Sequence, residues 1–284
     1  MSLQFNKLIA YIRGAYILRI SIIRKCLKFF SGILANLLYG QFKEISIGSK
    51  YPIILNSKFA FSSFELWGEE HNSGFERLID VSDSKDVVFD IGAHIGLCSL
   101  PLSLYTSVKN IIAFEPSENN QKFLKEHIKI NNISNIELVP LLIGAKNSDH
   151  VNFYETGDVS GIPSIVNLSS LNKSEKVFQI SKKHQVCLDY FCKTNNILPD
   201  VIKIDVEGAE FDVLEGASKT IVEKNPIIII SLHPKHLKAI GRDIKEIFDY
   251  TERFDYELVD CVDARLIEED DLGLNEFMMR PIIL

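Results

Sequence analysis

Acidic residues follow three apolar segments of the chain. The first segment, Val87–Ile91, contains Asp90 and leads into Gly92 and Gly96 in a D-x-G-x-x-x-G pattern. Glycines permit a tight turn from strand to helix and a close approach of the backbone to a ligand. The pattern lacks the G-x-G-x-x-G spacing that places a pyrophosphate at a helix N-terminus, which disfavours an NAD-dependent oxidoreductase. An acid before the first glycine suits a ligand that carries positive charge.

The second acid is Glu115, which precedes Pro116 at the end of the apolar run Ile111–Phe114. It lies about one βαβ step after the glycine turn, where a carboxylate can accept hydrogen bonds from both ribose hydroxyls. A Glu-Pro pair that merely starts a helix is the structural alternative. Because Asp90 stands in the matching position of the preceding strand, the ribose role is favoured.

The third group follows Val201–Ile204 and contains Asp205, Glu207 and Glu210. Open α/β sheets bind ligands at the carboxyl ends of their strands, so we expect Asp205 and Glu207 to face the same crevice as Asp90. Glu210 is interpreted as a charge that complements the first turn of the following helix.

A histidine ends the next apolar run, Ile227–Leu232. His233 could act as a general base, because the ordinary histidine pKa of about 6.5 is close to neutral pH; a histidine that closes the strand end with a hydrogen bond is the alternative. Strand alternation predicts that Ser231 and His233 share a face, and His236 is interpreted as a surface residue. Asp205 or His233 would accept a proton, or Asp205 and Glu207 would hold a divalent cation, since oxygen ligands suit Mg²⁺ or Ca²⁺.

Apolar runs alternate with helical segments from Asp86 to the C-terminus, and this alternation predicts an α/β domain with a mostly parallel, doubly wound sheet. The strands are expected at Val87–Ile91, Ile111–Phe114, Ile136–Ile143, Val201–Ile204, Ile227–Leu232, Tyr256–Val262 and Phe277–Leu284. The helices are expected at Ile95–Ser107, Glu118–Asn131, Glu210–Glu223 and Lys235–Tyr250.

The sequence divides into three parts. Residues 1–44 form a basic extension, residues 45–85 a lead-in or cap, and residues 86–284 the main domain. The lead-in is expected to hold extended runs at Tyr51–Leu55 and Phe59–Phe64 and a helix at Phe75–Val81; its Trp67 is assigned to the core rather than to a pocket wall. Residues 146–185 are interpreted as a surface insertion above the active side.

The basic extension has helical periodicity over residues 7–38, and Gly14 and Gly32 are expected to divide it. Its apolar stripe either packs on the domain or on a second subunit, which would make a homo-oligomer, or lies in a membrane surface with its cations toward anionic lipid. The stripe is formed by Leu8, Ile12, Tyr16, Ile23, Leu27, Phe30, Leu34 and Leu37.

Charge and cysteine content restrict the partners and the compartment. The 284-residue chain has a net charge of -7, although its first 43 residues contain no Asp or Glu. An acidic body argues against nucleic acid as a partner. The five cysteines lack the paired spacing of a zinc site. No secretory signal is recognised, so the cytoplasm is expected, with the inner membrane face as a peripheral site.

Four segments, in this order and spacing, resemble the FkbM family of methyltransferases: FDIGAHIG, AFEPSENNQKFLKEHIKINN, CLDYF and DVIKIDVEGAEFDVLEGA. The resemblance covers residues 86–233. It implies a Rossmann-like class I methyltransferase fold, S-adenosylmethionine as cofactor, and O-methylation of a hydroxyl on a sugar, glycan or other natural product. Donor binding is assigned to Asp90, Gly92, Ala93, His94, Gly96, Glu115 and Pro116, and the acceptor side to Asp205, Glu207 and His233.

Two positions depart from the family pattern. His94 stands where the family usually has a small polar residue such as Asn, and Ser231 where it often has Glu, so that a carboxylate holding the acceptor or an ion is replaced. A protein that binds S-adenosylmethionine without turnover, as a scaffold at a membrane surface, is therefore the alternative to an enzyme.

Overall fold

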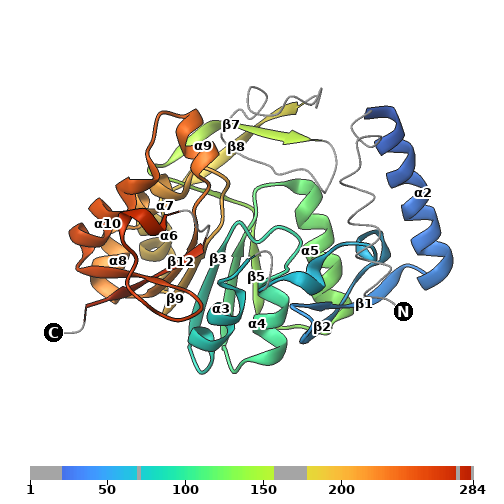
Figure 1. The fold of residues 1–284 in the computed structure, drawn as a ribbon, viewed down its shortest axis with the longest axis horizontal. Coiled ribbons are helices and arrows are strands. Elements are labelled where there is room, and N and C mark those ends of the chain that lie inside the picture. Colours follow the sequence, from blue (N-terminus) through green and yellow to red (C-terminus); the bar gives the residue numbers. More distant parts are fainter. Residues whose placement is uncertain (1–20, 69–71, 157–177, 273–275, 283–284) are drawn as a thin grey trace.

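A seven-stranded sheet forms the centre of the computed structural model, which describes residues 21–68, 72–156, 178–272 and 276–282 (Figure 1). The strand order is β11-β12-β10-β9-β3-β4-β5. All adjacent pairs from β10 to β5 are parallel, whereas β12 runs antiparallel to both of its neighbours. This is the predicted mostly parallel, Rossmann-like sheet. The strands are β3 (Val87–Ile91), β4 (Asn110–Phe114), β5 (Ile136–Val139), β9 (Val201–Ile204), β10 (Ile227–Ser231), β11 (Tyr256–Asp260) and β12 (Glu276–Pro281).

Both faces of the sheet are buried, which explains the unbroken apolar runs of its strands. Phe89 and Ile202 pack with helices α6, α7, α8 and α10, while their neighbours Val88 and Val201 pack on the opposite face with α3 and α4. α5 covers this second face through Leu124. The helices are α3 (Phe75–Ser82), α4 (Ser99–Tyr105), α5 (Glu118–Ile130), α6 (Leu188–Asn195), α7 (Glu210–Gly216), α8 (Ser218–Lys224), α9 (Pro234–Ala239) and α10 (Ile247–Phe254).

Several predicted elements are shorter than expected. The segment 136–143 divides at Pro140 into β5 and β6 (Leu142–Ile143), since proline has no N–H for a sheet. The predicted helix 210–223 divides after Gly216, where a side chain would meet the Gly144 carbonyl at 2.1 Å. The predicted helix 235–250 is interrupted at Gly241, which has φ +79°, and a short 3₁₀ turn, Ile244–Glu246, precedes α10.

Apolar residues of the lead-in, such as Ile53 and Leu55, pack in one buried cluster with Val88 and Val201 of the main sheet. The lead-in begins with a hairpin of β1 (Phe42–Ile47) and β2 (Tyr51–Asn56), and β1 was not predicted. The run 59–64 is not extended as expected, because 3₁₀ turns lie at Ser57–Phe59 and Phe64–Leu66. The Nε2 atom of buried His127 on α5 accepts a hydrogen bond from Asn56 N, and its Nδ1 donates to Ile95 O. The hairpin is thereby tied to the turn that follows β3.

The N-terminal extension contributes α2 (Ser21–Tyr39), which runs along the side of the domain (Figure 1). The helix is continuous through Gly32, so the predicted division there is wrong; Gly14 lies outside the described residues. Ala35 is buried with Phe61, but Phe30, Leu34 and Leu37 are 64%, 46% and 79% exposed. One interpretation expected this stripe to pack on the domain, whereas these three side chains remain largely exposed. Among the described helices, none has the length and apolarity needed to cross a membrane.

The insertion forms an antiparallel hairpin of β7 (Ser148–Thr156) and β8 (Phe178–Val186), which the sequence did not predict as strands. β6 pairs in parallel with β8 and completes a three-stranded sheet. In Figure 1 this hairpin lies above the main sheet. Residues 157–177 of the predicted insertion are outside the described part of the chain.

Candidate functional site

The turn after β3 requires its glycine. Gly92 has φ +89°, and a side chain there would lie 2.0 Å from the Asp205 carbonyl oxygen. The Gly92 and Ala93 amides both donate to Phe114 O at the end of β4. His94 has φ +52°, a conformation that Asn, Asp and His adopt more readily than other non-glycine residues. A positive φ at this position is compatible both with the Asn expected from the family resemblance and with the His94 found here.

Glu115 faces this turn from the end of β4. Its carboxylate accepts hydrogen bonds from His94 N at 2.7 Å and from Ser117 N at 2.8 Å. Burial raises the pKa of Glu115 to about 8, although these hydrogen bonds oppose the rise. A carboxylate held by backbone amides at this position is suited to accept hydrogen bonds from ligand hydroxyls.

Asp90 is completely enclosed at the end of β3. Ser99 Oγ donates to its Oδ2 at 2.5 Å, whereas Oδ1 has no hydrogen-bond partner among the described residues. Burial raises the pKa of Asp90, and the nearby charge of Lys203 opposes this rise. Asp90 therefore offers an acceptor oxygen beside the cavity.

A cavity of about 280 Å³ opens between the ends of β3, β4 and β9, close to the lower limit of roughly 300 Å³ for small-molecule sites. Phe153 of the inserted hairpin and Trp67 of the lead-in contribute to its wall, so Trp67 has a place in the cavity as well as its edge-on contact with Phe75. Its lining includes eight of the ten residues predicted for the donor and acceptor: Asp90, Gly92, Ala93, His94, Glu115, Pro116, Asp205 and Glu207.

Gly96 and His233 do not line this cavity. A side chain at Gly96 would meet Leu124 at 2.6 Å and Leu100 at 3.1 Å, and φ is +95°. Its glycine is thus explained by packing of the turn against α4 and α5. His233 lies farther along the crevice, beyond Asp205 and Glu207.

Lys203 is a buried cation that the sequence reasoning passed over. It is the Cα partner of Asp90 in the β3–β9 ladder, and its Nζ lies 3.1 Å from Asp205 Oδ2. Burial lowers the pKa of Lys203, but Asp205 and other nearby acids raise it above its ordinary value. Burial raises the pKa of Asp205, but the positive charges of Lys203 and His233 outweigh burial and bring this pKa below its usual range. Lys203 therefore keeps Asp205 ionised.

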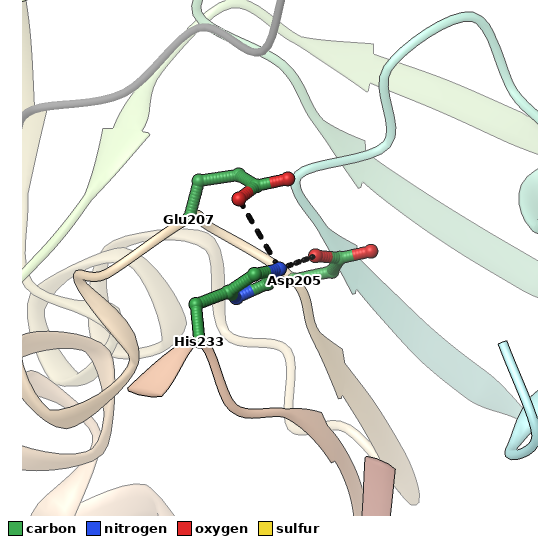
Figure 2. A group of neighbouring side chains, drawn as sticks. All are labelled: Asp205, Glu207 and His233. Atoms are coloured by element: carbon green, nitrogen blue, oxygen red, sulfur yellow. Dashed lines mark ion pairs between the residues drawn. The ribbon is translucent and has the colours of Figure 1, made fainter. Parts of the chain in front are cut away.

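Asp205, Glu207 and His233 converge at the ends of β9 and β10 (Figure 2). His233 Nε2 lies 3.2 Å from Glu207 Oε2 and 3.7 Å from Asp205 Oδ1. One ligand atom from each residue falls within 4.8 Å of the others. Glu207 has φ +57°, an unfavourable conformation for a residue with a side chain.

Two further residues complete this cluster, and both correct the sequence interpretation. Glu210 is fully buried, and its Oε1 accepts hydrogen bonds from Gly208 N and from His233 Nδ1 at 2.7 Å; it does more than complement a helix end. His236 is not simply a surface residue, because its Nδ1 lies 3.0 Å from Glu207 Oε2 and its ring stacks on His233. The His233–Glu210 and His236–Glu207 contacts each join segments that follow different strands, β10 and β9.

The carboxylate that Ser231 does not provide comes from a neighbouring strand. Ser231 is buried and pairs in register with Glu276 of β12, and its Oγ donates to Glu276 Oε1 at 2.8 Å. Glu276 also accepts a hydrogen bond from Gly74 N at 2.7 Å. Ser231 thus holds Glu276, while His233 contacts Glu210, so the two residues predicted to share a face have different partners.

The surroundings of His233 argue against the predicted general base. Burial lowers the pKa of His233, but the hydrogen bond to Glu210 and the charges of Glu207 and Asp205 raise it to about 9. At neutral pH the imidazole is then protonated and has no lone pair to accept a proton.

The sequence model of the Methyltransferase FkbM domain matches residues 90–258. The hexuronic acid methyltransferase AglP of Haloferax volcanii is 26% identical over 55% of this chain and 59% of its own length. A tRNA(Phe) (4-demethylwyosine(37)-C(7)) aminocarboxypropyltransferase of Methanocaldococcus jannaschii is 31% identical over 38% of this chain and 41% of its own length. The chain thus spans about half the length of the curated relatives that it matches.

Solved structures with a similar fold include a methyltransferase FkbM from Methylobacillus flagellatus, which is 19% identical with a TM-score of 0.46 over 69% of this chain and 43% of that chain. M. jannaschii TYW2 in complex with AdoMet is 16% identical with a TM-score of 0.44 over 85% and 87% of the two chains.

Proposed function

Because the chain belongs to the FkbM methyltransferase family, we propose that it is an S-adenosylmethionine-dependent O-methyltransferase that acts on a hydroxyl of a sugar or glycan. The observation that carries the proposal is a single cavity with two chemically different ends. The glycine turn and Glu115 form one end, and Asp205 and Glu207 form the other.

The first end suits the donor. Glu115 would accept the ribose hydroxyls, as a carboxylate after the second strand does in nucleotide-binding sheets. Asp90, whose Oδ1 has no hydrogen-bond partner in the described part of the chain, would attract the positively charged amino-acid part of the donor. The cavity wall is otherwise largely apolar, through Leu97, Phe114 and Leu142, which suits the adenine ring.

The second end suits the acceptor hydroxyl. Its oxygen would attack the sulfonium methyl carbon in line, while the carbon–sulfur bond breaks and its electron pair stays on sulfur as S-adenosylhomocysteine forms. The hydroxyl proton would pass to Asp205 or Glu207, since Lys203 and protonated His233 cannot accept it. Orientation of the two reactants and exclusion of water from the sulfonium would supply most of the acceleration.

A sugar acceptor is supported by one relative, which is a hexuronic acid methyltransferase. The test is methyl transfer from labelled S-adenosylmethionine to a panel of uronic and neutral oligosaccharides, followed by mass spectrometry of the acceptor and assay of S-adenosylhomocysteine. Glu207→Gln should lower kcat about 10²- to 10⁴-fold with little change in donor affinity, whereas Glu252→Gln on the exposed face of α10 should not. Donor binding without product on any acceptor would instead support the scaffold alternative.

We further propose that the extension, residues 7–38, attaches the protein peripherally to the inner face of a membrane. Exposed Phe30, Leu34 and Leu37 support this proposal, together with the absence of acidic residues before Glu44, because apolar and cationic groups act together at anionic lipid surfaces. Phe30→Asn with Leu37→Asn should reduce flotation with anionic liposomes, and Val222→Asn, at a 61% exposed residue of α8, should not. Unchanged flotation with a change in sedimentation would identify a second copy of the chain as the occupant.

A further inference from the structure

We propose that Asp205, Glu207 and His233 are the protein ligands of one first-row divalent metal ion, such as Mn²⁺, Fe²⁺, Co²⁺ or Zn²⁺, bound between the ends of β9 and β10. The role of this ion in methyl transfer rests on the proposed function, but its binding does not. The ligand set has one nitrogen and two carboxylates from two neighbouring strand ends (Figure 2).

The distances are compatible with a shared ion. Metal–ligand distances for such ions are about 2.0 to 2.2 Å, so adjacent ligand atoms in an octahedral shell lie roughly 3 Å apart. His233 Nε2 is 3.2 Å from Glu207 Oε2 and 3.7 Å from Asp205 Oδ1. All three ligand atoms lie within 4.8 Å of one another, so they would need to approach by less than about 2 Å to meet around one ion.

Glu210 supplies an independent reason for a metal-binding histidine. A carboxylate can only accept a hydrogen bond, so the 2.7 Å contact requires a proton on His233 Nδ1 and directs Nε2 toward Asp205 and Glu207. Metal-binding histidines characteristically donate their second ring N–H to such a carboxylate. Glu210 is fully buried, and its other oxygen has no hydrogen-bond partner among the described residues; its charge is therefore compensated through His233, by the proton on the ring or by a metal ion that replaces this proton.

The formal charges also favour a divalent ion. Asp205, Glu207 and Glu210 are three carboxylates, and Lys203 Nζ contacts Asp205 through Oδ2, the oxygen that faces away from His233. A metal ion at Nε2 would replace the proton that His233 carries there without metal, and with this neutral imidazole two negative charges remain around the ring. Buried charges need such compensation, and one divalent cation provides it.

The nitrogen ligand selects the class of ion. Mg²⁺ and Ca²⁺ bind oxygen ligands almost exclusively, whereas imidazole together with carboxylates suits first-row transition ions. This choice departs from the Mg²⁺ or Ca²⁺ that the two carboxylates alone suggested. Since Asp205 and Glu207 also line the donor cavity, an ion with three protein ligands would have positions left for the acceptor hydroxyl, whose pKa it would lower.

The experiment measures metal binding to the full chain after treatment with a chelator and without donor. Binding of Co²⁺ is monitored by its visible absorption, and binding of Mn²⁺ by the loss of the paramagnetic resonance signal of the free ion. We expect one ion per chain. His233→Gln and Glu207→Gln should each weaken binding at least about 100-fold, and Glu210→Gln about 10- to 100-fold, because it orients His233 without touching the ion. His184→Gln, an exposed histidine paired with Asp149, is the matched control and should bind like the wild type.

Binding of 5′-methylthioadenosine and thermal unfolding show whether each variant is folded. If His233→Gln does not fold, the loss of metal binding in Glu207→Gln tests the proposal instead. Absence of saturable Co²⁺ or Mn²⁺ binding to the wild type would overturn the proposal, as would binding that His233→Gln leaves unchanged. Binding of Mg²⁺ as tight as that of Mn²⁺ would also overturn it. Loss of nucleoside binding alone would count against the proposed function and not against the metal site.

Discussion

Nucleoside binding in the cavity should strengthen as the pH rises from 6 to 9. Burial raises the pKa of Glu115 to about 8, and only the ionised carboxylate can accept a hydrogen bond from each of two ribose hydroxyls with its two oxygens. Affinity is therefore gained as the pH rises through this pKa and becomes constant above it. Roughly 1% of Glu115 is ionised at pH 6 and about nine-tenths at pH 9, which corresponds to an approximately 100-fold increase in affinity.

Isothermal calorimetry with 5′-methylthioadenosine measures this dependence directly. The ligand keeps the ribose and adenine of the donor but lacks its amino and carboxyl groups, so their titration does not enter. Glu115→Gln removes the titrating group and should give weak binding that is independent of pH. An affinity of the wild type that stays constant between pH 6 and 9 would refute the ribose role of Glu115 or its raised pKa.

Three further predictions concern stability and are measured by urea unfolding. Gly92→Ala should lower the free energy of unfolding by about 3 kcal/mol, because the added carbon would lie 2.0 Å from a carbonyl oxygen; Gly32→Ala, with open space around it, should change it by less than about 1 kcal/mol. Lys203→Met should cost about 3 to 5 kcal/mol by leaving buried carboxylates unpaired, whereas Lys109→Met, which breaks an exposed ion pair, should cost less than about 1 kcal/mol. His127→Leu should cost about 2 to 3 kcal/mol and accelerate amide exchange in β2; unchanged exchange there would contradict its link to the hairpin.

The central strands were predictable because both of their faces are buried. β3 and β9 begin and end where the sequence predicted, and β4 and β10 differ by one residue. Continuous apolar runs indicate the strands of a parallel sheet. The acidic residues that end these runs then lie at the same edge of the sheet, where the carboxyl ends of parallel strands meet. β1 and the hairpin of β7 and β8 were missed, because their strands contain many polar residues and lack the uninterrupted apolar signal.

Site residues at the end of a strand were predictable from the sequence. Residues that reach the site only through tertiary contacts were not. Glu210 and His236 each have a sufficient local explanation at a helix start, and only the fold brings both to the Glu207 and His233 cluster. Lys203 did leave a signal in the sequence. A lysine within a four-residue apolar strand, two positions before an aspartate, has no place in a buried parallel sheet unless acids surround it.

The position of Lys203 links the two ends of the cavity. Asp90 is its neighbour across the β3–β9 ladder, Asp205 lies 3.1 Å from its ammonium, and the charge of Glu276 also acts on it. Burial alone raises the pKa of Asp90 and of Glu276, and without a cation these groups would take up protons and lose their charge. Lys203 lowers the pKa of Asp205 and opposes the rise in the pKa of Asp90 and of Glu276, so it favours the negative charge of the crevice. A negative crevice attracts a sulfonium donor at one end and a metal ion at the other, so a single buried cation serves both proposed sites.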